Sequence, residues 1–229
     1  MDKFLKNVII ISCGPGLNEI KTEFGHAIEW IKCASNNSNV NFISVDAYKS
    51  EIPTFDQGDG WIITGSSASV YEDLEWIVEL EEAIKRAYET EKPILGICFG
   101  HQLIAQALGG VVEKNSKGWE LGAYPLEIVS SKSVIFDKII ENDYYYYSHQ
   151  DVVTKLPMGA HITAVNEMGI QGFQIGKKTF GVQFHPEFSH DVIKKYVEVR
   201  SKMGANVIDS VVRESQTSYL ILNNFLKIL

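Results

Sequence analysis

The sequence contains little cysteine. Cys13, Cys33 and Cys98 are the three cysteines among 229 residues, an odd number spread far apart. This spacing excludes a disulfide framework and lacks the close cysteine pairs of zinc sites. We therefore expect no metal site and a reducing, cytoplasmic setting. We also expect Cys13 and Cys33 to be packed and unreactive.

The sequence also lacks a positive charge balance, a long apolar run and a nucleotide-binding glycine loop. The formal net charge is -8, which argues against general nucleic-acid binding. No apolar run is long enough to span a membrane. The run Val8–Ile11 is short and leads into a turn, which is typical of a first buried strand and not of a signal peptide. No Gly-x-x-x-x-Gly-Lys-Ser/Thr segment is present. We expect no nucleic-acid partner, no membrane association and no cofactor.

The most informative segment that is present spans residues 92–102. Its apolar run at 94–97 is typical of a buried parallel strand. Gly96 and Gly100 flank Cys98 two residues away on each side, which is the spacing of a nucleophile elbow. Such a turn holds the nucleophile in a strained conformation at the carboxyl edge of a sheet. The positive end of the helix that follows would favour the thiolate, the reactive form.

By itself, a Gly-x-Cys-x-Gly segment favours a buried structural cysteine in a glycine-rich turn. A second segment, 181–187, changes this interpretation, because a predicted strand there delivers His185 and Glu187 follows two residues later. A thiol nucleophile needs a base, and the base needs a group that orients it. Cys98, His185 and Glu187 are therefore a candidate catalytic triad.

The order of predicted elements indicates an α/β fold. Strands and helices alternate in the first half, which predicts a central, mostly parallel sheet flanked by helices. Residues 111–180 are rich in Val, Ile and Tyr with glycine turns, which predicts a small antiparallel β region. Because sites in parallel sheets lie at the carboxyl ends of strands, we expect Gly65, Cys98 and His185 at one edge. The expected strands include 8–12, 40–45, 61–63 and 94–97, and the expected helices include 19–34, 74–89, 101–108 and 191–203.

Taken together, these segments resemble class I glutamine amidotransferases. Residues 96–102 and 181–187 match the two signatures of that family. Segments 65–71, 148–151 and 118–122 are similar to parts of its GMP-synthetase-like branch and of its stand-alone members. The resemblance extends from Val8 to about Phe188. It implies a flavodoxin-like fold in which residues 1–229 form one amidotransferase domain.

The resemblance also implies a role for each matching residue. Cys98 would attack the side-chain amide of glutamine, His185 would act as base and then as acid, and Glu187 would orient His185. A γ-glutamyl thioester would form and be hydrolysed. The implied oxyanion hole consists of main-chain N–H groups of Phe99, Gly65 and Ser66. The implied substrate-binding residues are Gln102, His149, Gln150 and Asp151.

Two positions depart from the family pattern. Gln150 stands where the Ser-His-Gly-Asp segment of the family has glycine, and Ser66 stands where the synthetase branch often has a second glycine. Both changes leave the triad intact. A side chain at position 150 can narrow the substrate pocket, so the identity of the substrate stays open.

Three functions fit these residues. We predict a glutamine amidotransferase or glutaminase that releases ammonia and glutamate, with a separate synthetase chain as a possible partner. The first alternative is a stand-alone γ-glutamyl peptidase, which the Gly118–Gly122 segment slightly favours. The second is a non-catalytic regulatory module on the same fold, against which the complete triad argues.

Overall fold

The fold is built on a central sheet of eight strands. The computed structural model describes residues 5–35, 39–130, 133–140, 142–205 and 212–229. The strands of this sheet are β1 (Lys6–Ser12), β2 (Val40–Asp46), β3 (Gly60–Ile63), β4 (Ile94–Ile97), β7 (Glu127–Ile128), β10 (Ala160–Asn166), β11 (Gly169–Ile175) and β12 (Thr179–Val182).

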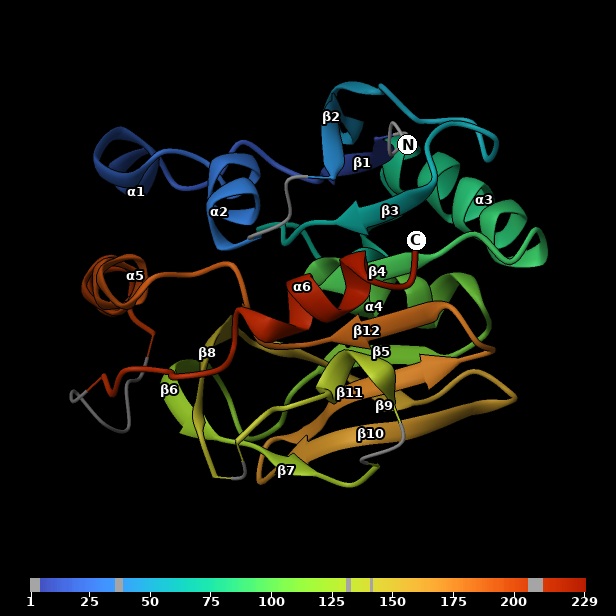
Figure 1. Ribbon diagram of the computed structural model, residues 1–229. Coiled ribbons are helices and arrows are strands. Elements are labelled where there is room, and N and C mark those ends of the chain that lie inside the picture. The colour runs from blue at the N-terminus through green and yellow to red at the C-terminus, as the bar shows by residue number, and fades with distance from the viewer. Residues whose placement is uncertain (1–4, 36–38, 131–132, 141, 206–211) are drawn as a thin grey trace.

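The sheet is parallel in one half and antiparallel in the other. Its strand order is β2-β1-β3-β4-β12-β11-β10-β7 (Figure 1). The pairs from β2 through β12 are parallel, whereas β11, β10 and β7 continue the sheet in antiparallel fashion. Two small antiparallel pairs lie beside it. These are β5 (Val111–Lys114) with β9 (Asp151–Lys155), and β6 (Glu120–Pro125) with β8 (Tyr144–His149). The predicted α/β fold, with a mostly parallel sheet and a small antiparallel region, is confirmed.

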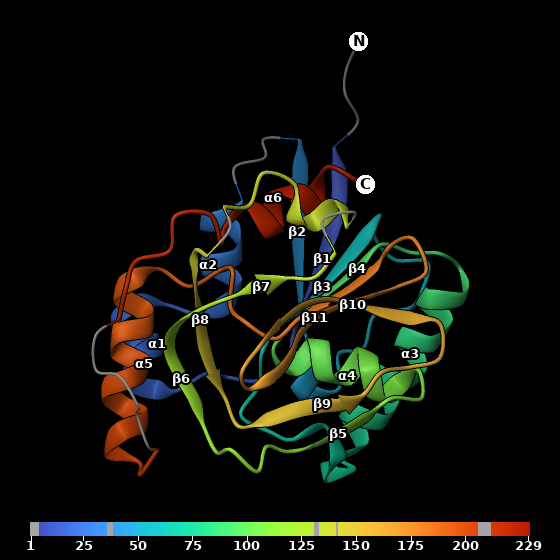
Figure 2. The ribbon, with the colours of Figure 1, turned by 90° about the horizontal axis from the view of Figure 1, so that it is seen from below.

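Helices cover both faces of the parallel half. The helices are α1 (Asn18–Phe24), α2 (Ala27–Ala34), α3 (Glu75–Glu89), α4 (Phe99–Ala107), α5 (His190–Lys202) and α6 (Leu220–Leu226). Figure 2 shows α3 and α4 on one side of β1, β3 and β4, with α2 and α6 on the other. Among the residues that the structure describes, no helix has the length and apolar content needed to cross a membrane.

The alternation of side chains in β1 explains why both faces are covered. Successive residues of a strand point to opposite faces. Ile9 and Ile11 enter the core under α3 and α4, and Val8 and Ile10 enter the core under α2 and α6. A strand that is apolar on both faces is stable only when helices bury both, which fits its place inside a parallel sheet.

Two expectations for the first helical region were wrong. Residues 19–34 form two helices instead of one, because Gly25 adopts a φ of 80° and ends α1, after which His26 starts α2. Cys33 is exposed instead of packed. The buried residue of α2 is Ile31, and a residue two positions further lies about 200° around the helix from it. Cys13 is buried, as predicted.

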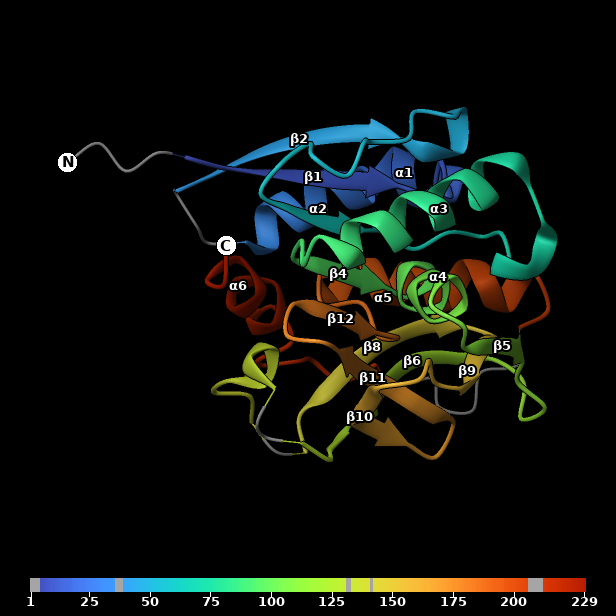
Figure 3. The ribbon, with the colours of Figure 1, turned by 90° about the vertical axis from the view of Figure 1, so that its right-hand side faces the viewer.

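The carboxyl ends of the parallel strands meet at one edge. In Figure 3 the arrows of β1, β2 and β3 point the same way, and β4 and β12 are parallel to them. The segments that follow β3, β4 and β12 carry Gly65, Cys98 and His185, respectively. These three residues therefore lie at the same edge, as the sequence predicts.

We expect Phe225→Ala to lower the free energy of unfolding by about 3–5 kcal/mol, since it removes a large buried ring from the core. Phe225 of α6 is fully buried, and its ring contacts the Phe180 ring of β12 edge to face, with the two ring centroids 6.4 Å apart. Urea unfolding would measure the loss. Lys227→Ala, an exposed position just after α6, is the control and should change stability by about 0.5 kcal/mol or less. Equal stability of the two variants would contradict the integration of α6 into the core.

Candidate active site around Cys98

The nucleophile candidate Cys98 occupies a sharp turn between β4 and α4. Its backbone angles are φ 52° and ψ -103°, a conformation that costs L-residues about 1–3 kcal/mol. A Cβ at Gly96 would come within 2.4 Å of the Gly100 carbonyl, and a Cβ at Gly100 within 2.4 Å of the Ile63 carbonyl oxygen. Only glycine fits at either position. The predicted strained elbow is therefore present in the structure.

The predicted oxyanion residues lie around Cys98. Phe99 is the first residue of α4, so its N–H has no acceptor within the helix. A Cβ at Gly65 would lie 3.1 Å from His185 Cε1 and 3.7 Å from Cys98 Cβ. The loop after β3 thus packs directly against both side chains, and Ser66 lines the same cavity.

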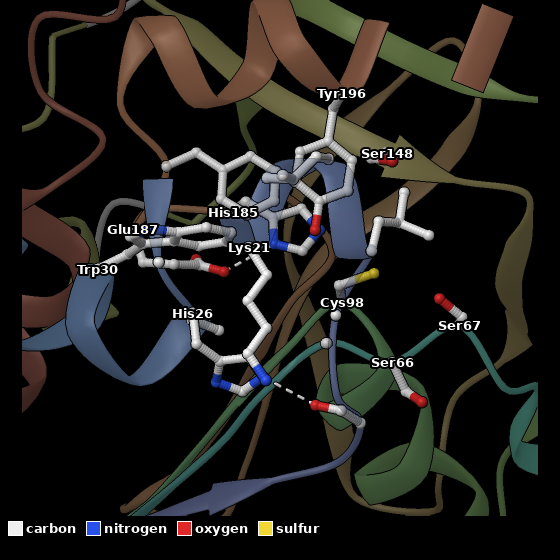
Figure 4. A pocket seen from close by; sticks show the side chains of 18 of the residues that line it. Lys21, His26, Trp30, Ser66, Ser67, Cys98, Ser148, His185, Glu187 and Tyr196 are labelled. Carbon is white, nitrogen blue, oxygen red and sulfur yellow. Dashed lines mark hydrogen bonds and ion pairs between the residues drawn. The ribbon is translucent and has the colours of Figure 1, made fainter. Parts of the chain in front are cut away.

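His185 and Glu187 form a buried pair beside Cys98. His185 Nδ1 donates to Glu187 Oε1 at 2.8 Å, which leaves Nε2 to exchange a proton with Cys98. In Figure 4 His185 lies between Glu187 and Cys98. Burial acts to lower the pKa of His185, but the Glu187 carboxylate and the neighbouring Cys98 side chain outweigh it and raise this pKa to about 10. The surroundings therefore favour the imidazolium form of His185.

Aromatic rings hold the imidazole of His185 in place. The Phe188 ring stacks on it with centroids 4.0 Å apart and planes 12° from parallel. The Tyr196 ring of α5 stacks on Phe188 with centroids 4.8 Å apart. The Trp30 ring of α2 contacts Phe188 edge-on with centroids 5.4 Å apart. The Phe188 ring, packed between the rings of Tyr196 and Trp30, thus limits the rotation of the imidazole, as a proton-transfer group requires.

Three of the predicted substrate-binding residues are bonded to one another. The carbonyl oxygen of Asp151 accepts from Gln102 Nε2 at 2.8 Å and lies 3.1 Å from His149 Nδ1. The carboxylate of Asp151 accepts from Ser69 Oγ at 2.6 Å and from Tyr71 at 3.1 Å. These bonds fix the turn between β8 and β9, which also carries Gln150.

The buried carboxylate of Glu120 stabilises the turn between β8 and β9 through His149. Glu120 Oε2 lies 2.8 Å from His149 Nε2 and accepts from Gln171 Nε2 at 3.0 Å. Glu120 Oε1 accepts from Asn166 Nδ2 at 2.5 Å. Buried carboxylates are stable only when their oxygens are paired in this way. Both ring nitrogens of His149 are thus engaged in holding the turn.

The cavity at Cys98 has two lobes that meet at the sulfur. We call one the Asp151 lobe and the other the α1–α2 lobe. The Asp151 lobe is lined by Ser69, Phe99, Gln102, Trp119, His149, Gln150 and Asp151, among others. The α1–α2 lobe is lined by Lys21, His26, Trp30, Gly65, His185, Glu187, Phe188 and Tyr196, among others. The residues that line both lobes are Ser66, Ser67, Cys98, Ser148 and Arg200. The structure therefore brings all ten predicted site residues to one cavity.

Sequence reasoning missed several residues of this cavity. Lys21 and His26 follow β1, so the rule that sites lie beyond strand carboxyl ends could have found them. Arg200 and Tyr196 lie on α5, and no local pattern connects them to Cys98.

Within the described ranges, no group of three or more His, Cys, Asp or Glu side chains is arranged to hold a metal ion.

Comparisons with known proteins agree with this arrangement. The family model for glutamine amidotransferase class-I matches residues 32–200. Gamma-glutamyl peptidase 4 of Arabidopsis thaliana is 34% identical over 158 residues, which cover 67% of this chain and 63% of the relative. A GMP synthase [glutamine-hydrolyzing] of Aquifex aeolicus is 39% identical over 138 residues, 59% of this chain and 26% of the relative. The chain thus spans less than two thirds of the length of these relatives.

A solved structure shows the same fold. The crystal structure of a glutamine amidotransferase from Thermotoga maritima superimposes with a TM-score of 0.77 at 24% sequence identity. The match covers 97% of each chain.

We expect Glu187→Gln to lower the pKa of His185 from about 10, because it removes a carboxylate that favours the imidazolium. This pKa lies above the ordinary value of 6.5. Protonated His185 therefore stabilises the fold fully below about pH 6.5, and this contribution is lost as the pH rises through about 10. NMR titration of labelled histidine would follow the ring directly. Glu23→Gln, which removes a surface ion pair with Lys195, should leave the titration unchanged. Titration of wild-type His185 near 6.5 would contradict the pairing.

We expect Glu120→Gln to lower the free energy of unfolding by about 3 kcal/mol, because it breaks a buried paired carboxylate. Urea unfolding measures this change. Glu113→Gln is the matched control, since Glu113 is exposed and its carboxylate accepts from the exposed Thr154 hydroxyl. A Glu120→Gln protein as stable as the Glu113→Gln protein would show that the turn does not depend on Glu120.

Proposed function

Because this chain belongs to the glutamine amidotransferase class-I family, we propose that it hydrolyses γ-glutamyl amides through a Cys98–His185–Glu187 triad. The observation that carries the proposal is the meeting of the strained Cys98 turn and the buried His185–Glu187 pair at one cavity. The substrate is glutamine or another γ-glutamyl compound.

In the first step the Cys98 thiolate attacks the γ-carbonyl carbon of the substrate. The carbonyl oxygen becomes an oxyanion, which the main-chain N–H of Phe99 and the loop at Gly65 and Ser66 stabilise by hydrogen bonds. The C–N bond then breaks, and His185 gives its proton to the departing nitrogen. The products of this half-reaction are a γ-glutamyl thioester on Cys98 and ammonia or an amine.

In the second step water attacks the thioester. His185, now neutral, takes a proton from the water, the C–S bond breaks, and glutamate leaves with Cys98 again as thiolate. Glu187 keeps the imidazole oriented in both steps through its bond to Nδ1. The protein supplies the polar turn at Asp151 for the zwitterionic end of the substrate, since Gln150 and Asp151 both line that lobe.

A second candidate function is a glutaminase subunit that passes ammonia to a separate synthetase chain. The observation in its favour is the identity of 39% with one part of a much longer GMP synthase. A regulatory module without activity is the remaining alternative. We also propose that residues 1–229 act as one amidotransferase domain, since α6 packs into the core of the sheet. The cytoplasmic location stays a prediction from cysteine content.

We expect Cys98→Ala to lose turnover on the order of a thousandfold or more, since it removes the nucleophile. Release of glutamate and of ammonia or amine from glutamine and from a γ-glutamyl dipeptide measures this loss. Cys33→Ala is the matched control, because Cys33 is exposed and lies outside the cavity, and it should retain activity. Appreciable turnover by the Cys98→Ala protein would reject the mechanism. Alkylation of Cys98 in a wild-type protein without any turnover would favour the regulatory module.

A further inference from the structure

The two lobes of the cavity would receive different parts of a γ-glutamyl substrate. His185 lines the α1–α2 lobe and is absent from the Asp151 lobe. Since His185 must protonate the departing nitrogen, the leaving group exits into the α1–α2 lobe. The glutamyl part then lies in the Asp151 lobe, against the polar turn.

The α1–α2 lobe runs from Cys98 to Lys21 of α1 and to Trp30 of α2 (Figure 4). It encloses about 50 Å³, less than the 170 Å³ of the Asp151 lobe. The volume of this lobe therefore does not distinguish ammonia from a larger leaving group, and the charge of its lining is the feature that bears on the choice.

Positive charge is concentrated in this lobe. Lys21 and Arg200 line it, although the whole chain has a net charge of -8. The lining includes one carboxylate, Glu187, and its Oε1 already accepts from His185 at 2.8 Å. A leaving group that carries a negative charge would therefore be attracted to this lobe.

Arg200 is the residue best placed to bind such a group. It lines both lobes, and its guanidinium lies over the Trp119 ring, 5.0 Å from the centroid. Its Nε is buried without a hydrogen-bond partner, and no ion pair of its side chain is found in the described part of the chain. A buried, unpaired donor on a charged group is costly. A planar guanidinium held on an aromatic ring is suited to bind a carboxylate with two parallel hydrogen bonds.

We propose that Arg200 and the α1–α2 lobe bind a carboxylate of the leaving group, so that γ-glutamyl amino acids and peptides are preferred over neutral γ-glutamyl amides. This inference rests on the proposed hydrolysis of γ-glutamyl amides at Cys98. The reaction itself is unchanged: the C–N bond breaks, His185 protonates the leaving amine, and the carboxylate of that amine stays ionised.

The first test compares two substrates of nearly equal size on the wild-type enzyme. γ-Glutamylglycine carries a carboxylate on its leaving group, and γ-glutamylglycinamide carries a neutral amide there. We expect kcat/KM to be about tenfold or more higher for the acid, as a lost charge-assisted hydrogen bond would give. Equal values for the two substrates would overturn the inference.

The second test assigns this preference to Arg200. In Arg200→Gln the ratio of kcat/KM for acid over amide should fall close to one, and Arg200→Lys should retain part of it. Lys194→Gln is the control, since Lys194 is exposed on the same helix outside the cavity, and it should keep the wild-type ratio. A general loss of structure would lower both rates without changing their ratio. An Arg200→Gln enzyme with the wild-type ratio would overturn the role of Arg200.

Glutamine is assayed alongside, with Cys98→Ala as the blank, to distinguish failure of the carboxylate subsite from failure of the proposed hydrolysis at Cys98. Turnover of all three substrates that depends on Cys98, without preference for the acid, would reject the carboxylate subsite alone. No turnover of any substrate would overturn the proposed function and this inference with it.

Discussion

The close packing of backbone around Cys98 is the constraint on which the site depends. Cys98 has a φ of 52°, and the turn stays in this conformation because Gly100 approaches the Ile63 carbonyl more closely than any side chain allows. Strain of this kind persists only where the surrounding structure over-determines it. Here β3, β4 and α4 supply the surrounding structure, so the central sheet fixes the position of the sulfur.

The rest of the site is arranged around that fixed sulfur by two buried polar groups. On one side Glu187 orients His185, and stacked aromatic rings limit its rotation. On the other side Glu120 and His149 hold the turn that carries Asp151. In both places a buried carboxylate lies within hydrogen-bond distance of an imidazole. This pairing lowers the free-energy cost of burying the carboxylate and gives the imidazole a single orientation. Polar atoms of Gln102, His149 and the Asp151 carboxylate serve to build this turn, whereas Gln150 and Ser148, whose hydroxyl is unpaired, also line the cavity.

The two lobes differ in charge, and this difference bears on the choice between a glutaminase and a peptidase. Ammonia leaves without recognition, so a glutaminase needs only an exit on the side of His185. An amino acid or peptide as leaving group needs contacts there, and Lys21, Trp30 and Arg200 surround that side. Both proposed functions would use the same triad and the same thioester. The family assignment therefore leaves the leaving group open, and in our proposal the residues of α1, α2 and α5 distinguish the substrates.

The sequence by itself determined the α/β architecture, the elbow at Cys98 and the identity of the His185–Glu187 pair, because each depends on neighbours within a few residues. Apolar runs, glycine spacing and the His-x-Glu segment are local patterns. The break between α1 and α2 at Gly25 and the exposure of Cys33 were not predicted, since helical spacing alone does not show where a single glycine ends a helix. Only the tertiary structure decided that Arg200 lies over Trp119 at the junction of the lobes, and that Glu120 supports His149. These pairs are 81 and 29 residues apart, and their contacts exist only because α5 packs beside β6 and because β6 pairs with β8.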